Sequence, residues 1–558
     1  MVSTSWISLI TLIPSLAAAL PFHVPVQRRS GFSLPIERRR VTRSSLHDRD
    51  DSEVAGGNVG LGDLADLFYT VAIQAGDVQT AVNLDTGSSD LWVMSDTCAT
   101  QTCKSSTSSP YQASSGTSTG ASVDLLYGDS TSGTHASGPV VLDTVTVAGL
   151  SLPSQPLAAI NDTDNSAVQN GGAGILGFGF PSQSFVQAAI VNARFNTPVT
   201  TDEFVSSVTT LGPIVSRLAA AGHIEQPLFA ITLQRDTVDL GGKGQVTIGE
   251  LPQGVDNSSI TWVPVRLYSS ADGGLNPPTF AKNEVYPLRW EVPLDGVYLD
   301  GKQLPSTKLT GTSPQLSALI DTGNSIVRGP QDVVNTILST VSPTFRPNSN
   351  APATFPCATA HTLAFKIGGQ LFPIDPRDFV SSTSSQDAKT CVASNIVATD
   401  PPSKGAQFSW SLGDTFLKSN LVAFYYGNLT HPSLDPPRIG FMSQVPQDAT
   451  DLLEQAVSEA QQSGGVFEST VDAAPTASTV LSLGATSSTA APSTSSTAPP
   501  SPSASAVIAQ ESAAPSSTSA PAPTQSADDK QKSGALPSSH LTLLFAAVPL
   551  LSLLSNCL

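Results

Sequence analysis

The chain has 558 residues, which is long enough for two lobes with separate hydrophobic cores. Hydrophobic residues make up 39% of it, and the formal net charge is −18 because Asp and Glu outnumber Lys and Arg by 45 to 27. This excess of negative charge argues against a nucleic-acid partner, since phosphate groups are bound by Lys and Arg.

The first 19 residues are typical of a secretory signal peptide. A short apolar stretch from Trp6 to Ile13 is followed by small residues that end at Ala19. The stretch is too short to span a bilayer. We therefore expect residues 1–19 to be removed and the protein to enter the secretory pathway.

Residues 20–54 differ from the rest of the chain because they are rich in arginine. The pair Arg28-Arg29 and the run Arg38–Arg40 are plausible processing sites. A basic segment of this kind can lie over an acidic cleft and neutralise it. We interpret residues 20–54 as a propeptide that is shed for activity; a disordered basic arm is the alternative.

Between residues 55 and 445 the sequence predicts a mainly β structure in two lobes. Short apolar runs such as Phe68–Ile73 and Gln245–Ile248 alternate with Gly, Pro, Ser, Asn and Asp. We place an N-terminal lobe at 55–245 and a C-terminal lobe at 246–445. Helical patterns are few, and the candidates are 185–191, 213–221 and 331–341.

Two segments near the C-terminus have compositions that predict no globular core. Residues 446–533 are rich in Ser, Thr, Ala and Pro, which predicts an O-glycosylated stalk or a plain disordered linker. Residues 534–558 combine a short spacer with the apolar run Leu541–Leu554, as in a GPI-attachment signal. We expect attachment at Ser533 or Gly534. A spanning tail anchor is the alternative, although it would need about 20 apolar residues.

Other features are also typical of a secreted glycoprotein. Sequons for N-glycosylation begin at Asn161, Asn257 and Asn428. Of the five cysteines, Cys557 lies in the tail that we expect to be removed, which leaves an even number. Because no CxxC pair exists and His is scarce, we expect disulfides and neither a metal nor another cofactor.

The strongest signal is an internal repeat of Asp-Thr-Gly. Asp85-Thr86-Gly87-Ser88 follows the apolar run 81–84, and Asp321-Thr322-Gly323-Asn324 follows the run 316–320. One such tripeptide would be an ordinary turn, but two copies in separate halves of a β region indicate a paired site. Glycine permits a tight turn that brings its N–H to a carboxylate, and each Thr can bond to the opposite loop.

Paired carboxylates explain why two aspartates would be needed. Two carboxylates held close together cannot both be ionised, so they share a proton. One can then activate water as a general base while the other protonates the substrate as a general acid. The sequence therefore predicts that Asp85 and Asp321 form a catalytic pair for peptide hydrolysis, without a fixed role for either residue.

The stretch Asp85–Val93 is similar to the active-site segment of the pepsin-like aspartic peptidases. The resemblance covers residues 68–442. It implies an all-β, bilobal fold whose active site lies in the cleft between the lobes. It also implies a monomeric aspartic endopeptidase that acts on proteins or peptides at acidic pH, by direct attack of water and without a covalent intermediate.

Further segments resemble other parts of the same family. Tyr127-Gly128-Asp129 looks like the flap hairpin over the cleft, which makes Trp92 the hydrogen-bond partner of Tyr127. Gly174–Gly177 and Ser411–Asp414 look like the segments that brace the two catalytic loops. The resemblance also implies the two disulfides Cys98–Cys103 and Cys357–Cys391.

Two positions bear on how this chain differs from the family. Asn324 stands where the family usually carries Thr or Ser; since an amide can donate to a carboxylate, we expect activity with a shifted pH profile. Asp129 resembles fungal relatives that accept Lys or Arg before the scissile bond, because a carboxylate attracts a cation. Because it combines Asp129 with the GPI signal, the chain resembles the yapsin-like, cell-surface branch of the family. The alternative for Asp129 is an exposed residue at the tip of the flap.

Two functions of other classes stay open at this point. A catalytically inactive relative would keep the fold and bind peptides. A structural cell-wall protein would depend mainly on the Ser/Thr-rich segment. Because both Asp-Thr-Gly copies keep their aspartate, we favour the secreted peptidase, placed at the cell surface by a GPI anchor in the plasma membrane or cell wall.

Overall fold

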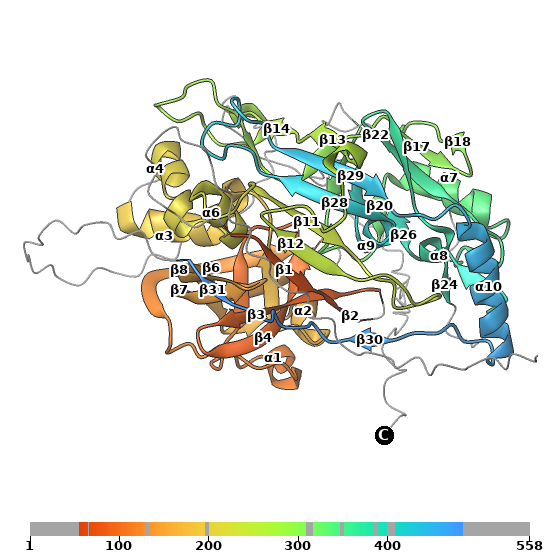
Figure 1. Cartoon of the computed structure of the whole chain (residues 1–558), viewed down its shortest axis with the longest axis horizontal. Helices are drawn as coiled ribbons and strands as arrows, with labels where there is room; N and C mark the ends of the chain where they lie inside the picture. The colour runs from red at the N-terminus through yellow and green to blue at the C-terminus, as the bar shows by residue number, and fades with distance from the viewer. Residues whose placement is uncertain are drawn as a thin grey trace, which may run out of the picture. The chain divides into compact units, whose positions relative to one another are not determined.

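A computed structural model describes residues 55–64, 66–128, 133–195, 200–308, 316–345, 351–382, 388–398 and 408–483. The predicted signal peptide, propeptide and GPI signal, together with Asp129, Ser533 and Gly534, lie outside these residues. The prediction of a mainly β protein is confirmed, because strands make up most of the regular structure in both halves (Figure 1).

The N-terminal lobe is built on one large sheet that ends in a flap-like hairpin. β3 illustrates why it forms: Tyr69, Val71, Ile73 and Ala75 alternate with more exposed residues, so one face enters the core. The strands of this sheet are β2 (Gly62–Leu64), β3 (Tyr69–Ala75), β4 (Val78–Asp85), β5 (Leu91–Met94), β6 (Thr117–Tyr127), β7 (Thr134–Val147), β8 (Leu150–Ile160), β9 (Asp162–Thr163), β10 (Gly174–Gly177), β30 (Val471–Asp472) and β31 (Leu481–Ser482).

A second sheet of six strands joins the two halves of the chain. Its order is β1-β12-β11-β28-β29-β13, so three strands from residues 57–248 lie beside three strands from residues 261–443, and the two groups pair through β11 and β28. The predicted lobe boundary between residues 245 and 246 therefore falls inside a strand of a shared sheet. The bounds are β1 (Gly57–Gly60), β11 (Leu228–Thr232), β12 (Gln245–Ile248), β13 (Thr261–Pro264), β28 (Asn420–Tyr425) and β29 (Arg438–Ser443).

The C-terminal lobe contains smaller sheets. Its central sheet holds β16 (Glu291–Pro293), β19 (Ser317–Ile320), β27 (Trp410–Leu412), β20 (Val327–Gly329) and β26 (Ile396–Ala398). The other strands form three groups: β17 (Gly296–Leu299), β18 (Lys302–Gln303), β22 (Leu363–Ile367) and β23 (Gln370–Pro373); β21 (Thr354–Pro356), β24 (Ser381–Ser382) and β25 (Thr390–Val392); and β14 (Leu267–Tyr268) with β15 (Tyr286–Pro287).

The three predicted helices are present as α3 (Phe185–Phe195), α6 (Ile214–Ala220) and α7 (Gln331–Val341). α7 buries Val333, Val334, Ile337 and Val341 on one face, as expected of an amphipathic helix. The sequence did not predict the short helices α1 (Gln101–Ser105), α2 (Ser166–Gln169), α4 (Thr201–Ser206), α5 (Val208–Leu211), α8 (Pro376–Phe379) and α9 (Asp414–Leu417), nor three 3-10 turns at Pro181–Gln183, Asn257–Ser259 and Ser270–Asp272.

Aromatic side chains connect the two halves of the chain close to the first Asp-Thr-Gly loop. The Trp290 indole and the Tyr426 hydroxyl, both from the second half of the chain, donate to the carbonyl of Phe178 at 2.9 and 2.6 Å. The Phe178 N–H in turn donates to the backbone carbonyl of Asp85 at 2.8 Å. Phe180 packs on Trp290 with ring centroids 4.1 Å apart. The first Asp-Thr-Gly loop is thus attached to the opposite lobe.

The chain after β29 corrects the prediction that a stalk begins at residue 446. α10 (Ala449–Gln462) buries one apolar face in the main core, formed by Leu453, Ala456, Val457 and Ala460. Beyond it, β30 pairs with β2 and β31 pairs with β8, so the C-terminal chain returns across to the N-terminal lobe (Figure 1). The predicted boundary is wrong because core side chains continue as far as Leu483.

The two ends of the described chain lie on either side of one turn. A Cβ added at Gly57 would lie 2.4 Å from the Ala148 carbonyl, between β7 and β8. From the other end, the Leu481 N–H donates to the Gly149 carbonyl at 2.7 Å. Gly57 and Leu481 therefore lie close together beside the turn between β7 and β8.

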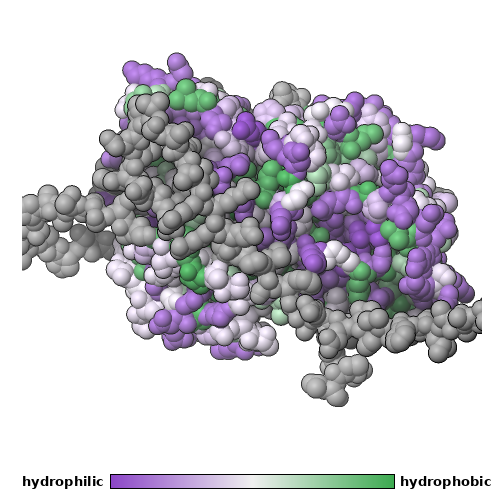
Figure 2. All heavy atoms as spheres, viewed as in Figure 1, coloured by the Kyte–Doolittle hydropathy of each residue, from purple (hydrophilic) through white to green (hydrophobic). Residues whose placement is uncertain are grey.

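Both predicted disulfides are present. Cys98–Cys103 and Cys357–Cys391 have Cα atoms 5.9 and 4.8 Å apart. On the visible face, polar side chains dominate and hydrophobic ones form small separate groups (Figure 2). Among the helices of the described residues, none has the length and apolar character needed to span a membrane.

Candidate active site

Each Asp-Thr-Gly copy sits at the end of a buried strand that another strand braces. β4 ends at Asp85 and runs parallel to β10, with Gly177 level with Asp85. β19 ends at Ile320, just before Asp321, and runs parallel to β27. The two segments that resembled bracing segments therefore occupy equivalent places in the two lobes.

Four hydrogen bonds lock the two loops together. The Thr86 N–H donates to Thr322 Oγ1 at 3.0 Å, and the Thr322 N–H donates to Thr86 Oγ1 at 3.1 Å. Each hydroxyl also donates across the interface, Thr86 to the carbonyl of Ile320 at 2.8 Å and Thr322 to that of Leu84 at 2.7 Å. Since both threonines are buried, these contacts fix the separation of the two aspartates.

The two carboxyl groups face each other across the glycines. The Gly87 N–H donates to Asp85 Oδ1 at 2.7 Å, and the Gly323 N–H donates to Asp321 Oδ1 at 2.9 Å. A Cβ added at Gly87 would lie 2.4 Å from Asp321 Oδ1, and one at Gly323 would lie 2.4 Å from Asp85 Oδ1. Glycine is required at both places because each opposing carboxyl occupies the space of a side chain.

Burial makes this pair hold a proton. Burial and the neighbouring Asp85 carboxylate raise the pKa of Asp321. Burial also raises the pKa of Asp85, although the hydrogen bonds from Ser88 and Gly87 act against this rise. Because each carboxyl lies against the glycine of the opposite loop, the two groups are close enough that one shared proton between them is the favoured state.

The second motif departs from the first at Asn324. The Ser88 hydroxyl donates to Asp85 Oδ2 at 2.5 Å. Asn324, at the equivalent position, instead donates its amide to the Ile326 carbonyl at 2.7 Å and to Ser411 Oγ at 2.9 Å. Our expectation that Asn324 donates to the catalytic carboxylate is therefore wrong, because its amide is already used within its own lobe.

The flap residues come together as the resemblance implied. The Trp92 indole donates to the Tyr127 hydroxyl at 2.9 Å, and the two ring centroids are 6.2 Å apart. Burial and the carboxylates of Asp90 and Asp85 raise the pKa of Tyr127 well above its usual value, so this hydroxyl keeps its proton. Gly128 follows with a positive φ of 91°, where the hairpin turns.

Three polar residues at the site were not assigned roles from the sequence. Asp90 accepts from the Ser184 hydroxyl at 2.5 Å and from the Phe185 N–H at 2.8 Å, so it holds the start of α3. Ser411 anchors Asn324. The positive charge of Arg328 acts on Asp321 and favours its ionised form. Asp90 and Ser411 lie inside quoted motifs, but their partners are distant in the sequence.

The three sequons have different surroundings. Asn161 is exposed at the end of β8, and Asn257 is exposed although its side-chain oxygen accepts from Trp262 at 2.8 Å. Asn428 is half-buried, and its side-chain oxygen accepts from the N–H groups of Thr430 and His431. Glycosylation at these sites stays a prediction.

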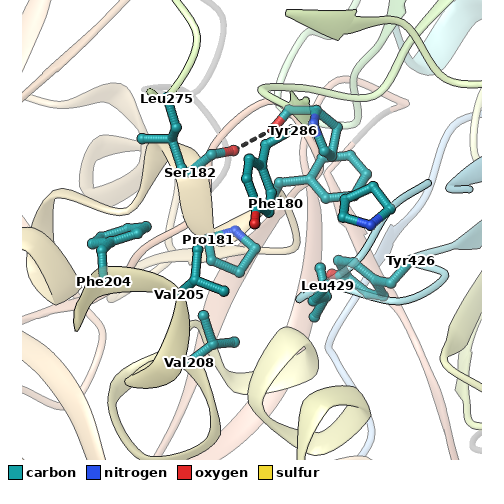
Figure 3. Close-up of a pocket in the computed structure, with 12 residues that line it drawn as sticks. Phe180, Pro181, Ser182, Phe204, Val205, Val208, Leu275, Tyr286, Tyr426 and Leu429 are labelled. Carbon is teal, nitrogen blue, oxygen red and sulfur yellow. Dashed lines mark hydrogen bonds between the residues drawn. The ribbon is translucent and has the colours of Figure 1, made fainter. Parts of the chain in front are cut away.

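An apolar pocket elsewhere lacks catalytic groups. It lies between the helices after Phe180 and loops of the C-terminal half, and the hydrogen bond drawn among its lining residues joins Ser182 to the 286–287 segment (Figure 3). The Ser182 hydroxyl donates to the Pro287 carbonyl, and the Tyr286 hydroxyl donates to that of Thr430 at 3.0 Å. In the part of the chain that the structure describes, no group of His, Cys, Asp and Glu side chains has the arrangement of a metal site.

Two buried carboxyls with raised pKa values, held on braced loops beside a tyrosine hairpin, define an aspartic peptidase. The description "Eukaryotic aspartyl protease" matches residues 68–431, so the chain belongs to that family. The predictions of a pepsin-like fold and of an aspartic-type endopeptidase are thereby confirmed.

Individual relatives are distant. The chain is 26% identical over 419 residues to "Aspartic protease" of Phaffia rhodozyma, covering 73% of this chain and 83% of that protein. It is 24% identical over 417 residues to "Major aspartyl peptidase 1" of Cryptococcus neoformans, covering 71% and 73%. It is 25% identical over 369 residues to "Cathepsin E" of Mus musculus, covering 65% and 79%.

Proposed function

We propose that this peptidase cleaves proteins and peptides at acidic pH through Asp85 and Asp321, with distinct starting roles for the two residues. The observation that carries the proposal is the pair of buried carboxyls, each placed against the glycine of the opposite loop. Ser88 and Gly87 donate to Asp85 and favour its ionised form, whereas Asp321 accepts from Gly323 and has no equivalent of Ser88.

This asymmetry supports a defined order of proton transfers. Asp85 removes a proton from a water molecule held between the carboxyls, and the resulting hydroxide adds to the peptide carbonyl carbon. Asp321 gives its proton to the carbonyl oxygen, which produces a neutral gem-diol. The proton on Asp85 then passes to the leaving amine as the C–N bond breaks, and one gem-diol hydroxyl returns its proton to Asp321. No covalent intermediate forms.

Single substitutions of the pair test these roles. Asp85→Asn and Asp321→Asn should each lower kcat by about a hundredfold or more, because each removes one acid–base group. Asp77→Asn, at the exposed turn after β3, makes the same chemical change away from the site and should keep full activity. Full proteolysis by either active-site variant at pH 4 would refute the assignment. Activity in the wild-type chain that a statine-type inhibitor blocks would exclude a catalytically inactive relative.

We further propose a preference for Lys or Arg before the scissile bond. Asp129 comes directly after Gly128 in the sequence, within the segment that resembles the family's flap, and a carboxylate there would attract a basic substrate side chain. Cleavage of a peptide library by wild type and by Asp129→Ala provides the test. Loss of the basic preference in the variant supports the proposal, and an unchanged cleavage pattern contradicts it.

We propose that the enzyme is secreted as a zymogen and held at the cell surface by a GPI anchor. The signal-peptide pattern of residues 1–19, the basic residues 20–54 and the terminal pattern of 534–558 support this. Phospholipase treatment of cells should release the enzyme, and a chain that ends at residue 533 should appear in the medium. Retention on cells after phospholipase treatment would favour a spanning tail instead.

A further inference from the structure

A strap of the chain after α10, defined here as residues 463–483, crosses from one lobe to the other. Phe467 is buried in the main core, and Ser469 pairs with Thr237. β30 then adds an antiparallel strand to the edge of β2, and β31 adds a parallel strand beside β8. The strap therefore completes the edge of the N-terminal sheet, which would otherwise present unpaired backbone groups.

The strap crosses that edge where acidic side chains are concentrated. In the β2–β30 pair, Asp472 lies directly opposite Asp63. The N–H of the strap residue Thr470 donates to the backbone carbonyl of Asp236 at 2.9 Å. Both Asp63 and Asp236 are nearly fully buried, at 2% and 4% exposure. Like charges directly opposite each other destabilise a pair of strands.

Every element packed around this point carries charged or titratable groups. The N-terminal segments, which are β2 with its turn and β3, contribute Asp63, Asp66 and Tyr69, and the segment after β11 contributes Arg235, Asp236 and Asp239. The C-terminal half contributes five groups near α8 and α9, namely Asp375, Arg377, Asp378, Asp414 and Lys418. The strap itself contributes Glu468 and Asp472.

The nearby cations form ion pairs with other carboxylates. Lys418 contacts Asp66 at 2.9 Å and Asp378 at 3.3 Å. Arg235 contacts Asp378 at 2.7 Å. Among the described residues, no ion pair reaches Asp63, Asp236 or Asp472, and the buried Asp236 Oδ2 accepts no hydrogen bond. In the described part of the chain the three carboxyl groups next to the strap thus form no ion pair of their own, although the more distant charge of Lys418 lowers the pKa values of Asp63 and Asp236.

We propose that the strap is an acid-closed latch: at acidic pH it pairs with β2, and toward neutral pH the ionisation of the carboxyl groups of Asp63, Asp236 and Asp472, which is easier once the strap has left, releases it. The latch concerns how the C-terminal chain is held and does not depend on the proposed substrate preference. It goes beyond the peptidase activity because the strap lies outside the residues that match the family.

The direction of the pH dependence follows from the proton balance. Burial, Asp66 and Asp236 raise the pKa of Asp63, and burial, Asp472 and Asp66 raise that of Asp236. Once the strap has left, both groups are more exposed and Asp236 also loses the Asp472 charge, so their pKa values fall toward the ordinary carboxyl value of about 4. The closed form therefore binds more protons than the released form. Its stability relative to the released form decreases as the pH rises from about 4 toward neutral.

Hydrogen exchange of the full chain, measured by mass spectrometry between pH 4 and 7.5 with a statine-type inhibitor present, tests the latch. Peptides from residues 463–483 should be protected at acidic pH and lose that protection by neutral pH, after correction for the intrinsic exchange rate. Peptides from the β7–β8 hairpin should stay protected throughout. A transition in which both regions open together would be global unfolding and would overturn the proposal.

Three variants separate the latch from other causes. Asp472→Asn should move the release midpoint to higher pH by about half a unit, the size expected of one nearby like charge. Asp236→Asn, which imitates the protonated acid, should keep the strap protected at neutral pH. Glu468→Gln makes the same charge change at an exposed strap residue and should leave the midpoint in place. Protection that does not vary with pH, or an equal shift in Asp472→Asn and Glu468→Gln, would overturn the proposal.

Discussion

Replacing Asn324 with serine should move the alkaline limb of the pH profile of kcat/KM toward lower pH. In the native chain the Asn324 amide donates to Ile326 and Ser411, so Asp321 lacks the side-chain donor that Asp85 has in Ser88. A serine hydroxyl at this position can donate to Asp321 as Ser88 donates to Asp85. The bond stabilises the ionised form of Asp321, so the pair loses its shared proton at a lower pH.

The size of the shift follows from the hydrogen bond gained. A hydrogen bond to a charged group contributes about 1.5–3 kcal/mol. Since one pKa unit corresponds to about 1.4 kcal/mol, the limb should move by about one to two units. Ser411→Ala offers a second route to the same end, because it removes one of the two acceptors of Asn324 and should produce a smaller shift of the same sign.

The assay is cleavage of a fluorogenic peptide from pH 2 to pH 8, with thermal unfolding measured in parallel. An alkaline limb that stays in place in Asn324→Ser, or moves to higher pH, would refute the reasoning. A shift of similar size in Asp77→Asn, which lies at an exposed turn, would show that general charge effects set the limb.

Three further outcomes follow from the fold. Thr86→Val removes hydrogen bonds to Ile320 and Thr322 and should lower the free energy of unfolding by about 2–4 kcal/mol in denaturant titrations; a loss below 1 kcal/mol would contradict the role of these bonds. Tyr127→Phe removes the acceptor of the Trp92 indole and should lower kcat/KM about tenfold. Unchanged kinetics would show that activity does not depend on the Trp92–Tyr127 hydrogen bond. A chain ending at residue 445 loses the buried face of α10 and should unfold at a clearly lower temperature than one ending at residue 483. Equal melting temperatures would instead support the predicted start of the stalk at residue 446.

The sequence was informative where the chemistry depends on a few residues that are adjacent in the chain. The repeated Asp-Thr-Gly, each copy after an apolar strand, located both carboxyls, and short apolar runs bounded by turn residues located strands such as β3 and β12. The bonds between Thr86 and Thr322 could be anticipated because the repeat itself implies two equivalent loops.

Other features depend on partners that are far away in the chain. Ser411 takes the Asn324 amide from 87 positions away, and local sequence gives no sign of it. Composition misled us after residue 445, since a Ser- and Ala-rich segment resembles a linker. The spacing of Leu453, Ala456, Val457 and Ala460 was the available signal for α10, and the strands of the strap are too short to show any periodicity.

The closeness of Gly57 and Leu481 beside the β7–β8 turn has a practical consequence for engineering. Where two ends of a folded region are near each other, a short linker can join them and new ends can be opened elsewhere. A circular permutant made in this way would carry its new termini at a site of choice, for example the exposed turn at Asp77, while the two catalytic loops keep their native connections.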